Sequence, residues 1–326
     1  MNVIILGCGL ISGRWIRALT ADPRVTVAGL VDSNPDAADA VLRRCGLDDI
    51  PAFPDLAAAY KATPDARIVV NLLPPDVHAA ASRQALGWGM HVFTEKPLAV
   101  TLQEAEALVR EARSCGLVLA VMSNRGHDTR FLTFRDLLHA TSDGPYAVNA
   151  EVFVRLPHPG FRSRLDLPAV ADLAVHAFDQ IGQLIRADPL TVTCVETPLP
   201  ALGSHRSVAC ATIQFADGSV FTFRGGYCGT GQRTSADGYW RIDTPDGGLR
   251  WDGANTAVVI RDTHPDEPDV IPLPASDGHA PRITAMVDAV HGGPKLPDGL
   301  DSIALLDAAL HAARTGSVTS VGQVQR

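Results

Sequence analysis

Two groups of polar residues have the types and spacing that acid–base chemistry needs. The first is Lys96, in the turn at residues 94–97, where Pro97 restricts Lys96 to an extended backbone. If the apolar run before it is a strand of a parallel sheet, Lys96 lies at the edge where such sheets bind ligands, and its ammonium group could stabilise a developing alkoxide. The alternative is a surface lysine before a proline, although only Lys61 and Lys295 accompany it among 28 basic residues.

The second group is Asp172 and His176, with Asp179 three residues further on. A spacing of four residues places Asp172 and His176 on one face of a helix. A carboxylate beside an imidazole can orient the ring and raise its pKa, which gives a base suited to taking a hydroxyl proton near neutral pH. The alternative is an ordinary ion pair on a helix surface.

A glycine-containing segment near the N-terminus has the pattern of a phosphate-binding turn. Gly7 allows a tight turn after the first apolar run, Gly9 lets the backbone approach a pyrophosphate, and the next helix starts with its N–H groups facing the phosphates. Asp32 ends the second apolar run, where a carboxylate accepts both ribose hydroxyls and repels a 2′-phosphate. NAD is therefore predicted over NADP, with NADP possible and a turn without a ligand as the alternative. The expected cofactor contacts here are Gly7, Gly9, Leu10, Ile11, Asp32 and Ser33.

The pattern of apolar residues predicts two domains that carry these groups. Before residue 122, short apolar runs alternate with helical patterns, which predicts βαβ units and a doubly wound parallel sheet of the Rossmann type. After residue 123 the chain reads as α+β with a mostly antiparallel sheet, because Asp-Gly turns join alternating runs. A single helix is expected over 167–185. The predicted domains are 1–122 for the dinucleotide and 123–326 for substrate and oligomerisation.

Charge and composition exclude several other classes of protein. The formal charge of −8 is unlike that of a general nucleic-acid binder. No uncharged apolar run approaches the ~18 residues that span a bilayer, so no membrane contact is expected. The six cysteines are not spaced as zinc ligands, which predicts no metal and a reducing, cytoplasmic location. Apolar residues on both faces of the second-half strands predict a homodimer or homotetramer, unless the chain's own helices cover them.

The motifs occur together in one order along the chain. Gly7-Cys8-Gly9, the Pro-Pro-Asp-Val-His segment at 74–78, Glu95-Lys96-Pro97 and the Asp172/His176 pair make the sequence resemble the Gfo/Idh/MocA family of oxidoreductases over essentially its whole length. The resemblance implies that Lys96, Asp172 and His176 are catalytic. It also implies that Leu73, Pro74 and His78 lie along the cofactor, with Glu95 and Lys96 near the nicotinamide ribose.

The sequence also departs from the family pattern. Residues 166–168 stand where the family has a glycine run, and Ala174 stands where glycine is usual, which stiffens the backbone there. Arg162 and Arg164 could face a pocket or be solvated, and Asn124 and Arg125 begin the second domain, where relatives often contact substrate. The candidate substrate residues are Asn124, Arg125 and Arg164.

The predicted function is an NAD(P)-dependent oxidoreductase acting on a secondary alcohol or ketone of a sugar, cyclitol or sugar-like intermediate, with a small polyhydroxylated molecule as its partner. Two alternatives stay open. One is a dinucleotide-binding regulator without catalysis, and the other is a redox-neutral enzyme that retains its NAD.

Overall fold

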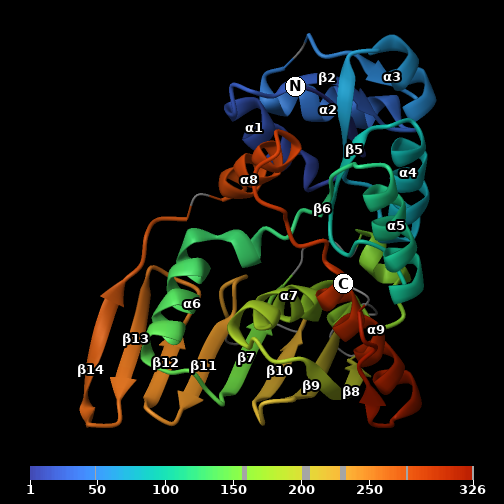
Figure 1. Cartoon of the computed structure of the whole chain (residues 1–326). Coiled ribbons are helices and arrows are strands. Elements are labelled where there is room, and N and C mark those ends of the chain that lie inside the picture. Colours follow the sequence, from blue (N-terminus) through green and yellow to red (C-terminus); the bar gives the residue numbers. More distant parts are fainter. Residues whose placement is uncertain (48, 156–159, 200–205, 228–232, 277, 325–326) are drawn as a thin grey trace. The chain divides into compact units, whose positions relative to one another are not determined.

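A computed structural model describes the chain except residues 48, 156–159, 200–205, 228–232, 277 and 325–326 (Figure 1). The chain divides into two compact units, each described by itself below. Unit 1 comprises Met1–Asn124 and Asp277–Leu300, and unit 2 comprises Arg125–Ser276 and Asp301–Arg326.

Unit 1 contains a parallel sheet of six strands among the described residues, in the order β3-β2-β1-β4-β5-β6. The order reverses between β1 and β4, which is where open α/β sheets bind ligands beyond the carboxyl ends of their strands. The doubly wound prediction is confirmed; only the two-residue β3 and the short α3 were not expected, because they are too short to show a period. The strands are Asn2–Leu6 (β1), Thr26–Val31 (β2), Ala52–Phe53 (β3), Ala66–Asn71 (β4), His91–Thr94 (β5) and Leu119–Val121 (β6). The helices are Ser12–Ala21 (α1), Pro35–Cys45 (α2), Leu56–Ala62 (α3), Pro75–Gly87 (α4) and Leu102–Ser114 (α5).

Unit 1 also contains a helix from near the end of the chain, α8 (Ala280–Val290). The predicted domain boundary placed this helix in the second domain, whereas it belongs to unit 1, which corrects that prediction. Ile283, Met286 and Val287 are buried in the same apolar cluster as Trp15 of α1. The apolar face of α8 is therefore part of the core of unit 1. The buried Arg282 donates from Nε to the carbonyl oxygen of Val121 over 3.0 Å, which ties α8 to the end of β6.

Unit 2 is built on a sheet in which the described residues form nine strands, in the order β14-β13-β12-β11-β7-β10-β9-β8-β15. All neighbouring strands are antiparallel except β7 and β10. This confirms the predicted α+β class, and Gly218 and Gly247 adopt positive φ in the two predicted hairpin turns. The strands are Ala147–Phe153 (β7), Pro189–Pro198 (β8), Ser207–Phe215 (β9), Val220–Gly226 (β10), Tyr239–Thr244 (β11), Gly247–Trp251 (β12), Thr256–Arg261 (β13), His264–Pro272 (β14) and Thr319–Ser320 (β15).

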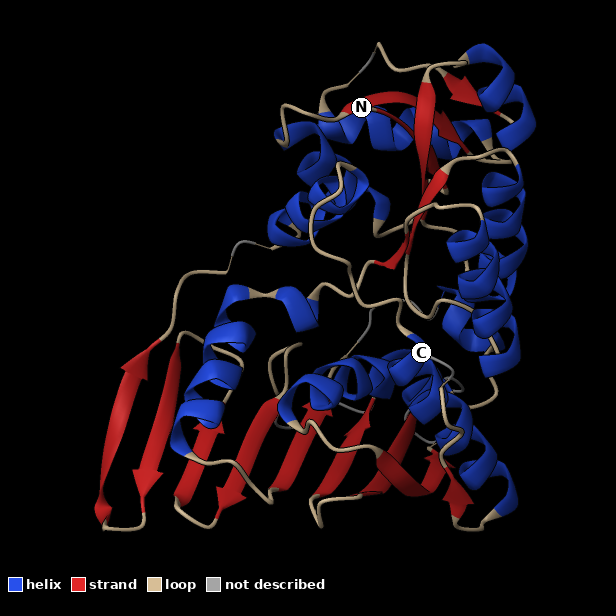
Figure 2. Cartoon of the chain, in the orientation of Figure 1, coloured by secondary structure: helices blue, strands red, loops and turns tan. Residues whose placement is uncertain are grey.

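Helices cover one face of this sheet (Figure 2): α6 (Thr129–Thr141), α7 (Val175–Leu184) and α9 (Leu300–Thr315). Two 3-10 turns precede α7, η1 (Arg125–His127) and η2 (Gly160–Arg164). The single helix expected over 167–185 is wrong in its first part, because Ala169–Ala174 (η3) forms a π-helix that continues into α7. Helical periodicity in a sequence does not separate α from π turns, and π segments are frequent at functional sites.

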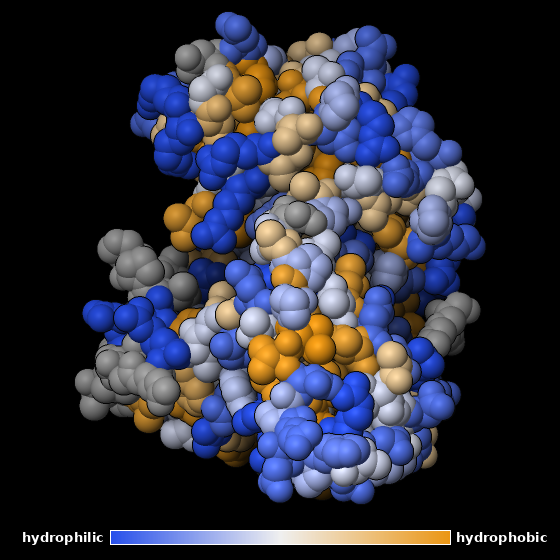
Figure 3. Space-filling view, turned by 90° about the vertical axis from the view of Figure 1, so that its left-hand side faces the viewer, coloured by the Kyte–Doolittle hydropathy of each residue, from blue (hydrophilic) through white to orange (hydrophobic). Residues whose placement is uncertain are grey.

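Three further observations concern the described helices, the surface and the cysteines. None of the helices that the structure describes is long and apolar enough to cross a membrane. On the face drawn in Figure 3, hydrophilic residues predominate and hydrophobic residues form smaller patches between them.

Five cysteines carry free thiols, namely Cys8, Cys45, Cys115, Cys194 and Cys210, whereas Cys228 lies outside the described residues.

Candidate active site

The glycine loop between β1 and α1 has the geometry of a dinucleotide cradle. Gly7 has a φ of +89°, and a Cβ there would lie 2.9 Å from the carbonyl oxygen of Leu72, so only glycine fits. A Cβ on Gly9 would meet no atom within 4 Å, so its backbone faces open space. No side chain caps α1 at Ile11, and the neighbouring Leu10 is 92% exposed. The N–H groups at this helix start therefore suit a phosphate.

Asp32 is held beside the glycine loop by backbone donors. Its two carboxylate oxygens accept hydrogen bonds of 2.8 Å from the N–H groups of Cys8 and Asn34. A carboxylate oxygen has further lone pairs, so the same group can still accept a ribose hydroxyl. The next residue, Ser33, is exposed. This arrangement fits NAD, because a 2′-phosphate would meet a fixed negative charge.

The turn that carries Lys96 is held from α1 and from β4. The N–H of Glu95 donates to the carbonyl oxygen of Asn71 over 2.8 Å, and the indole N–H of Trp15 donates to Glu95 Oε1 over 2.5 Å. Glu95 Oε2 accepts from the N–H of Lys96 over 3.1 Å, and the Lys96–Pro97 peptide is cis. The Glu95 side chain therefore positions the turn, and the predicted contact of Glu95 with the cofactor ribose stays a prediction.

His78 lies inside the protein. It is fully buried in α4, and its ring nitrogens lie 2.7 Å and 2.6 Å from the carbonyl oxygens of Pro97 and Leu73. Pro74 occupies the position before the first residue of α4, next to this contact, and its side chain makes no capping hydrogen bond. Both ring nitrogens therefore face backbone carbonyl groups, and His78 links the segments that follow β4 and β5 at the cofactor edge of the sheet. We therefore interpret His78 as a support for Leu73 and Pro74.

In unit 2, two side chains donate hydrogen bonds to Asp172. The buried Asp172 Oδ2 accepts from Arg162 Nε over 2.5 Å and from the hydroxyl of Tyr227. Burial raises the pKa of Tyr227 well above its usual 10, and the Asp172 charge adds to the rise. Burial alone would lower the pKa of Arg162, but Asp172 and Tyr227 raise it. The hydroxyl of Tyr227 therefore keeps its proton and donates it to Asp172, and Arg162 stays charged.

Of the two partners of Asp172, Tyr227 was not predicted, and Arg162 was predicted only as an arginine that could face a pocket. Tyr227 was not among the predicted site residues, because nothing in a single tyrosine signals a partner 55 residues away. Arg162 was considered, but Arg164 was chosen as the substrate residue; the structure places Arg164 on the exposed surface of η2. The predicted orientation of His176 by Asp172 stays a prediction, and His176 lies half-buried in the first turn of α7.

The π segment that carries Asp172 is anchored at its start. The carboxylate of Glu196 accepts from the N–H groups of Ala169 and Val170 over 3.0 Å and 2.9 Å, and from the hydroxyl of Ser207. Burial raises the pKa of Glu196, while these hydrogen bonds act in the opposite direction. A carboxylate at a helix start is stabilised by the helix dipole. The segment is therefore held at its start through the N–H of Ala169 and further on through the side chain of Asp172.

Arg125 joins the same cluster from η1. Burial lowers the pKa of Arg125, and Asp237, Tyr227 and Asp172 are close enough to oppose that shift. Gly126 makes the position possible, because a Cβ there would lie 2.2 Å from a carboxylate oxygen of α7. The predicted Asn124 is the last residue of this stretch of unit 1 and Arg125 the first of unit 2.

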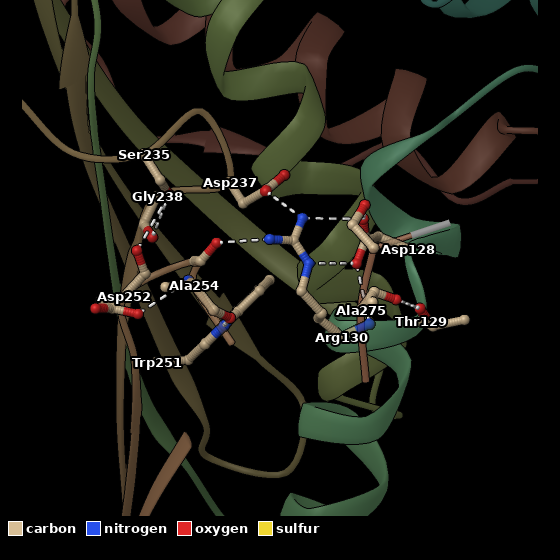
Figure 4. Close-up of polar contacts among 12 residues, drawn as sticks. Asp128, Thr129, Arg130, Ser235, Asp237, Gly238, Trp251, Asp252, Ala254 and Ala275 are labelled. Carbon is tan, nitrogen blue, oxygen red and sulfur yellow. Dashed lines mark hydrogen bonds and ion pairs between the residues drawn. The ribbon is translucent and has the colours of Figure 1, made fainter. Parts of the chain in front are cut away.

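An ion-pair network next to Arg125 fixes the start of α6 (Figure 4). Arg130 reaches between Asp128 and Asp237, with bonds of 2.8 Å and 2.9 Å, and donates to the carbonyl oxygen of Gly253 over 3.0 Å. Its exposed fraction is 13%, so the network is largely shielded from water. Across the described residues there is no group of three or more His, Cys, Asp or Glu side chains placed to hold a metal ion.

The fold and these groups define a class, a dinucleotide-binding oxidoreductase with a second α+β unit. Residues 1–123 match the model of the Gfo/Idh/MocA family, described as an oxidoreductase family with an NAD-binding Rossmann fold. The first 123 residues therefore match this family, as the resemblance in the sequence predicted, and the chain is an oxidoreductase whose cofactor is NAD.

Several relatives match this chain. A dTDP-3,4-didehydro-2,6-dideoxy-alpha-D-glucose 3-reductase from Actinomadura kijaniata is 27% identical over 96% of both chains. A UDP-N-acetylglucosamine 3-dehydrogenase from Acidithiobacillus ferrooxidans is 32% identical over 60% of this chain and 57% of its own length. An oxidoreductase from Escherichia coli, YdgJ, is 41% identical but matches over only 22% of its own length.

Among solved structures, GenD2 from gentamicin A biosynthesis in complex with NAD superposes with a TM-score of 0.83 at 22% identity. The match covers 99% of this chain and 97% of GenD2. This likeness confirms the two-unit fold.

Proposed function

We propose that this enzyme transfers hydride between NAD and a secondary alcohol or ketone of a sugar, a cyclitol or a sugar-like intermediate. The observation that carries the proposal is a complete glycine cradle with a fixed Asp32, in a chain that also has Lys96, Asp172 and His176 in the family's order. Named relatives act on nucleotide-linked sugars and on inositol. Those activities support the substrate class and not a particular substrate.

The roles proposed for the side chains follow from their chemistry. NAD, when bound, supplies the hydride acceptor for alcohol oxidation. His176 removes the hydroxyl proton, Lys96 stabilises the alkoxide, and Asp172 orients His176. Arg162 and Tyr227 hold the Asp172 side chain in place. Arg125 and Asn124 are proposed to bind hydroxyl groups of the substrate, with Arg164 as a further candidate from the sequence.

The test is absorbance at 340 nm with NAD or NADP and a panel of cyclitols, aldoses and sugar acids, and with the reduced cofactors and keto-sugars. We expect turnover with NAD and weaker or no turnover with NADP. NADH binding without turnover or substrate loss would favour a regulator. Substrate loss at constant absorbance would favour a redox-neutral enzyme with retained NAD.

A second copy of the chain is proposed to cover the open face of the nine-stranded sheet. No described helix lies on that face (Figures 1 and 2). Five side chains form a row across it, and its end members Val195 and Tyr239 are 55% and 37% exposed. Arg224 and Glu151 form an ion pair of 2.6 Å within the row. A two-fold axis can pair such a surface with itself. The row is Val195, Cys210, Arg224, Glu151 and Tyr239.

We expect the protein to sediment as a dimer or larger, and the variant Cys210→Arg to sediment as a monomer. The new guanidinium would lie opposite Arg224 in the row, so like charges would be buried in the interface. Val100→Arg is the matched control, because Val100 is 50% exposed in unit 1 and lies outside the sheet face. A monomeric wild-type protein at micromolar concentration would contradict the proposal.

A further inference from the structure

The start of the π segment depends on a carboxylate from a strand of the sheet. The first N–H groups of any helix have no carbonyl group in their own helix to bond. Pro168, the residue before the segment, has no N–H, and the N–H of Ala171 bonds the carbonyl oxygen four residues before it over 2.8 Å. The two N–H groups between them, those of Ala169 and Val170, donate to Glu196 of β8 over 3.0 Å and 2.9 Å.

Water cannot take the place of this carboxylate. Ala169 and Val170 are 0% and 1% exposed, and a buried N–H group that loses its acceptor destabilises the structure around it. Ser207 of β9 is also buried, and its hydroxyl donates to Glu196 Oε1, which holds the carboxylate at this position. Three donors therefore meet the two oxygens of Glu196, which is an arrangement that an ionised carboxyl group accepts.

The side chain of Asp172 holds the same segment further along. Asp172 lies two residues after Val170, and its carboxylate accepts from Tyr227, which directly follows β10, and from Arg162 of η2. The strands β8, β9 and β10 are neighbours in the sheet of unit 2, and the segment contacts β9 and β10. The segment is therefore held across three neighbouring strands, by its backbone at Glu196 and by its side chain at Asp172.

The π geometry makes the direction of Asp172 sensitive to this support. A π segment has hydrogen bonds between residues five apart and an α-helix between residues four apart, so a change from one to the other rotates side chains about the helix axis. Without Glu196, two buried N–H groups must find other acceptors, and the backbone that carries Asp172 must move with them.

We propose that Glu196 is a positioning residue for the oxidoreductase reaction, because it fixes the π segment and with it the direction in which Asp172 projects. Glu196 acts through Asp172, whose proposed role is to orient His176. The inference rests on the proposed function for its effect on turnover. Its effect on the ion pair between Asp172 and Arg162 needs no substrate.

The first experiment measures the turnover number of Glu196→Gln in the wild-type protein and in Asp172→Asn. An amide has one acceptor oxygen, so one of the two N–H groups would face an NH₂ group. We expect turnover to fall about tenfold or more in the wild-type protein and no further in Asp172→Asn, with NADH affinity changed by no more than about threefold. The same relative loss in both backgrounds overturns the proposal, and so does unchanged turnover in Glu196→Gln.

Glu267→Gln is the matched control, because Glu267 is an exposed carboxylate of β14 in the same unit. It should leave turnover unchanged. If Glu196→Gln does not fold, Glu196→Asp replaces it in both experiments. That variant keeps the charge but is one methylene shorter, so it should show a smaller loss with the same dependence on Asp172.

The second experiment is urea unfolding and does not depend on turnover. Asp172→Asn, Arg162→Met and the double variant give the coupling energy between these two side chains. We expect this coupling to fall to about half or less when the cycle is repeated in Glu196→Gln, because a displaced Asp172 no longer meets Arg162. Undiminished coupling overturns the positioning role even if no sugar of the panel is oxidised. Failure of this inference and failure of the proposed function are therefore distinguishable.

Discussion

Replacing Lys96 with methionine is expected to lower the turnover number by about a hundredfold to a thousandfold, with NADH affinity changed by no more than about threefold. Methionine keeps much of the side-chain length and removes the charge that stabilises the alkoxide. The turn itself should survive, because its recorded supports act through the Glu95 side chain, the Lys96 N–H and the Pro97 carbonyl oxygen. The measurement is steady-state oxidation of an active substrate from the panel, with NADH binding followed by fluorescence.

The control for this prediction is Lys295→Met, because Lys295 is an exposed lysine of the same unit. It should leave turnover unchanged. Unchanged turnover in Lys96→Met would remove Lys96 from the catalytic set.

The parts of the fold that the sequence predicted are those with local signals. Gly7 and Gly9 follow a strand, Asp32 ends the next strand, and Gly218 lies in an Asp-Gly turn between two alternating runs. Each of these depends on neighbours within a few residues. Right-handed βαβ connections then make the parallel sheet of unit 1 doubly wound.

The parts that the sequence did not predict depend on partners far along the chain. The apolar face of α8 shows that the helix is buried, but not that it packs with Trp15, more than 260 residues earlier. The ring of His78 was read from its motif as a cofactor contact, and only the structure shows the two carbonyls against it. The spacing of Asp172 and His176 assumed an α-helix, and the π turn changes the direction in which Asp172 projects.

The ion pair between Asp172 and Arg162 carries the second prediction with a large expected effect, a loss of stability. Asp172→Asn should reduce the free energy of unfolding by about 2–4 kcal/mol, because the change leaves the Arg162 guanidinium partly buried without its counter-charge. The side chains of Asp172 and Arg162 are 6% and 23% exposed, so the effect belongs toward the lower end of that range. Turnover should fall as well, because asparagine carries no charge to orient His176. Urea unfolding and steady-state kinetics measure the two effects.

A double-mutant cycle separates the ion pair from the other roles of Asp172. If the loss comes from an uncompensated guanidinium, adding Arg162→Met to Asp172→Asn should restore about 1–2 kcal/mol of stability without restoring turnover. Arg164→Met is the matched control, since Arg164 lies two residues away on the same 3-10 turn and is exposed; it should restore nothing. A double variant no more stable than Asp172→Asn would show that Arg162 does not stabilise this carboxylate. Recovery of stability alone would mean that this chain uses Arg162 to keep the buried Asp172 carboxylate in place.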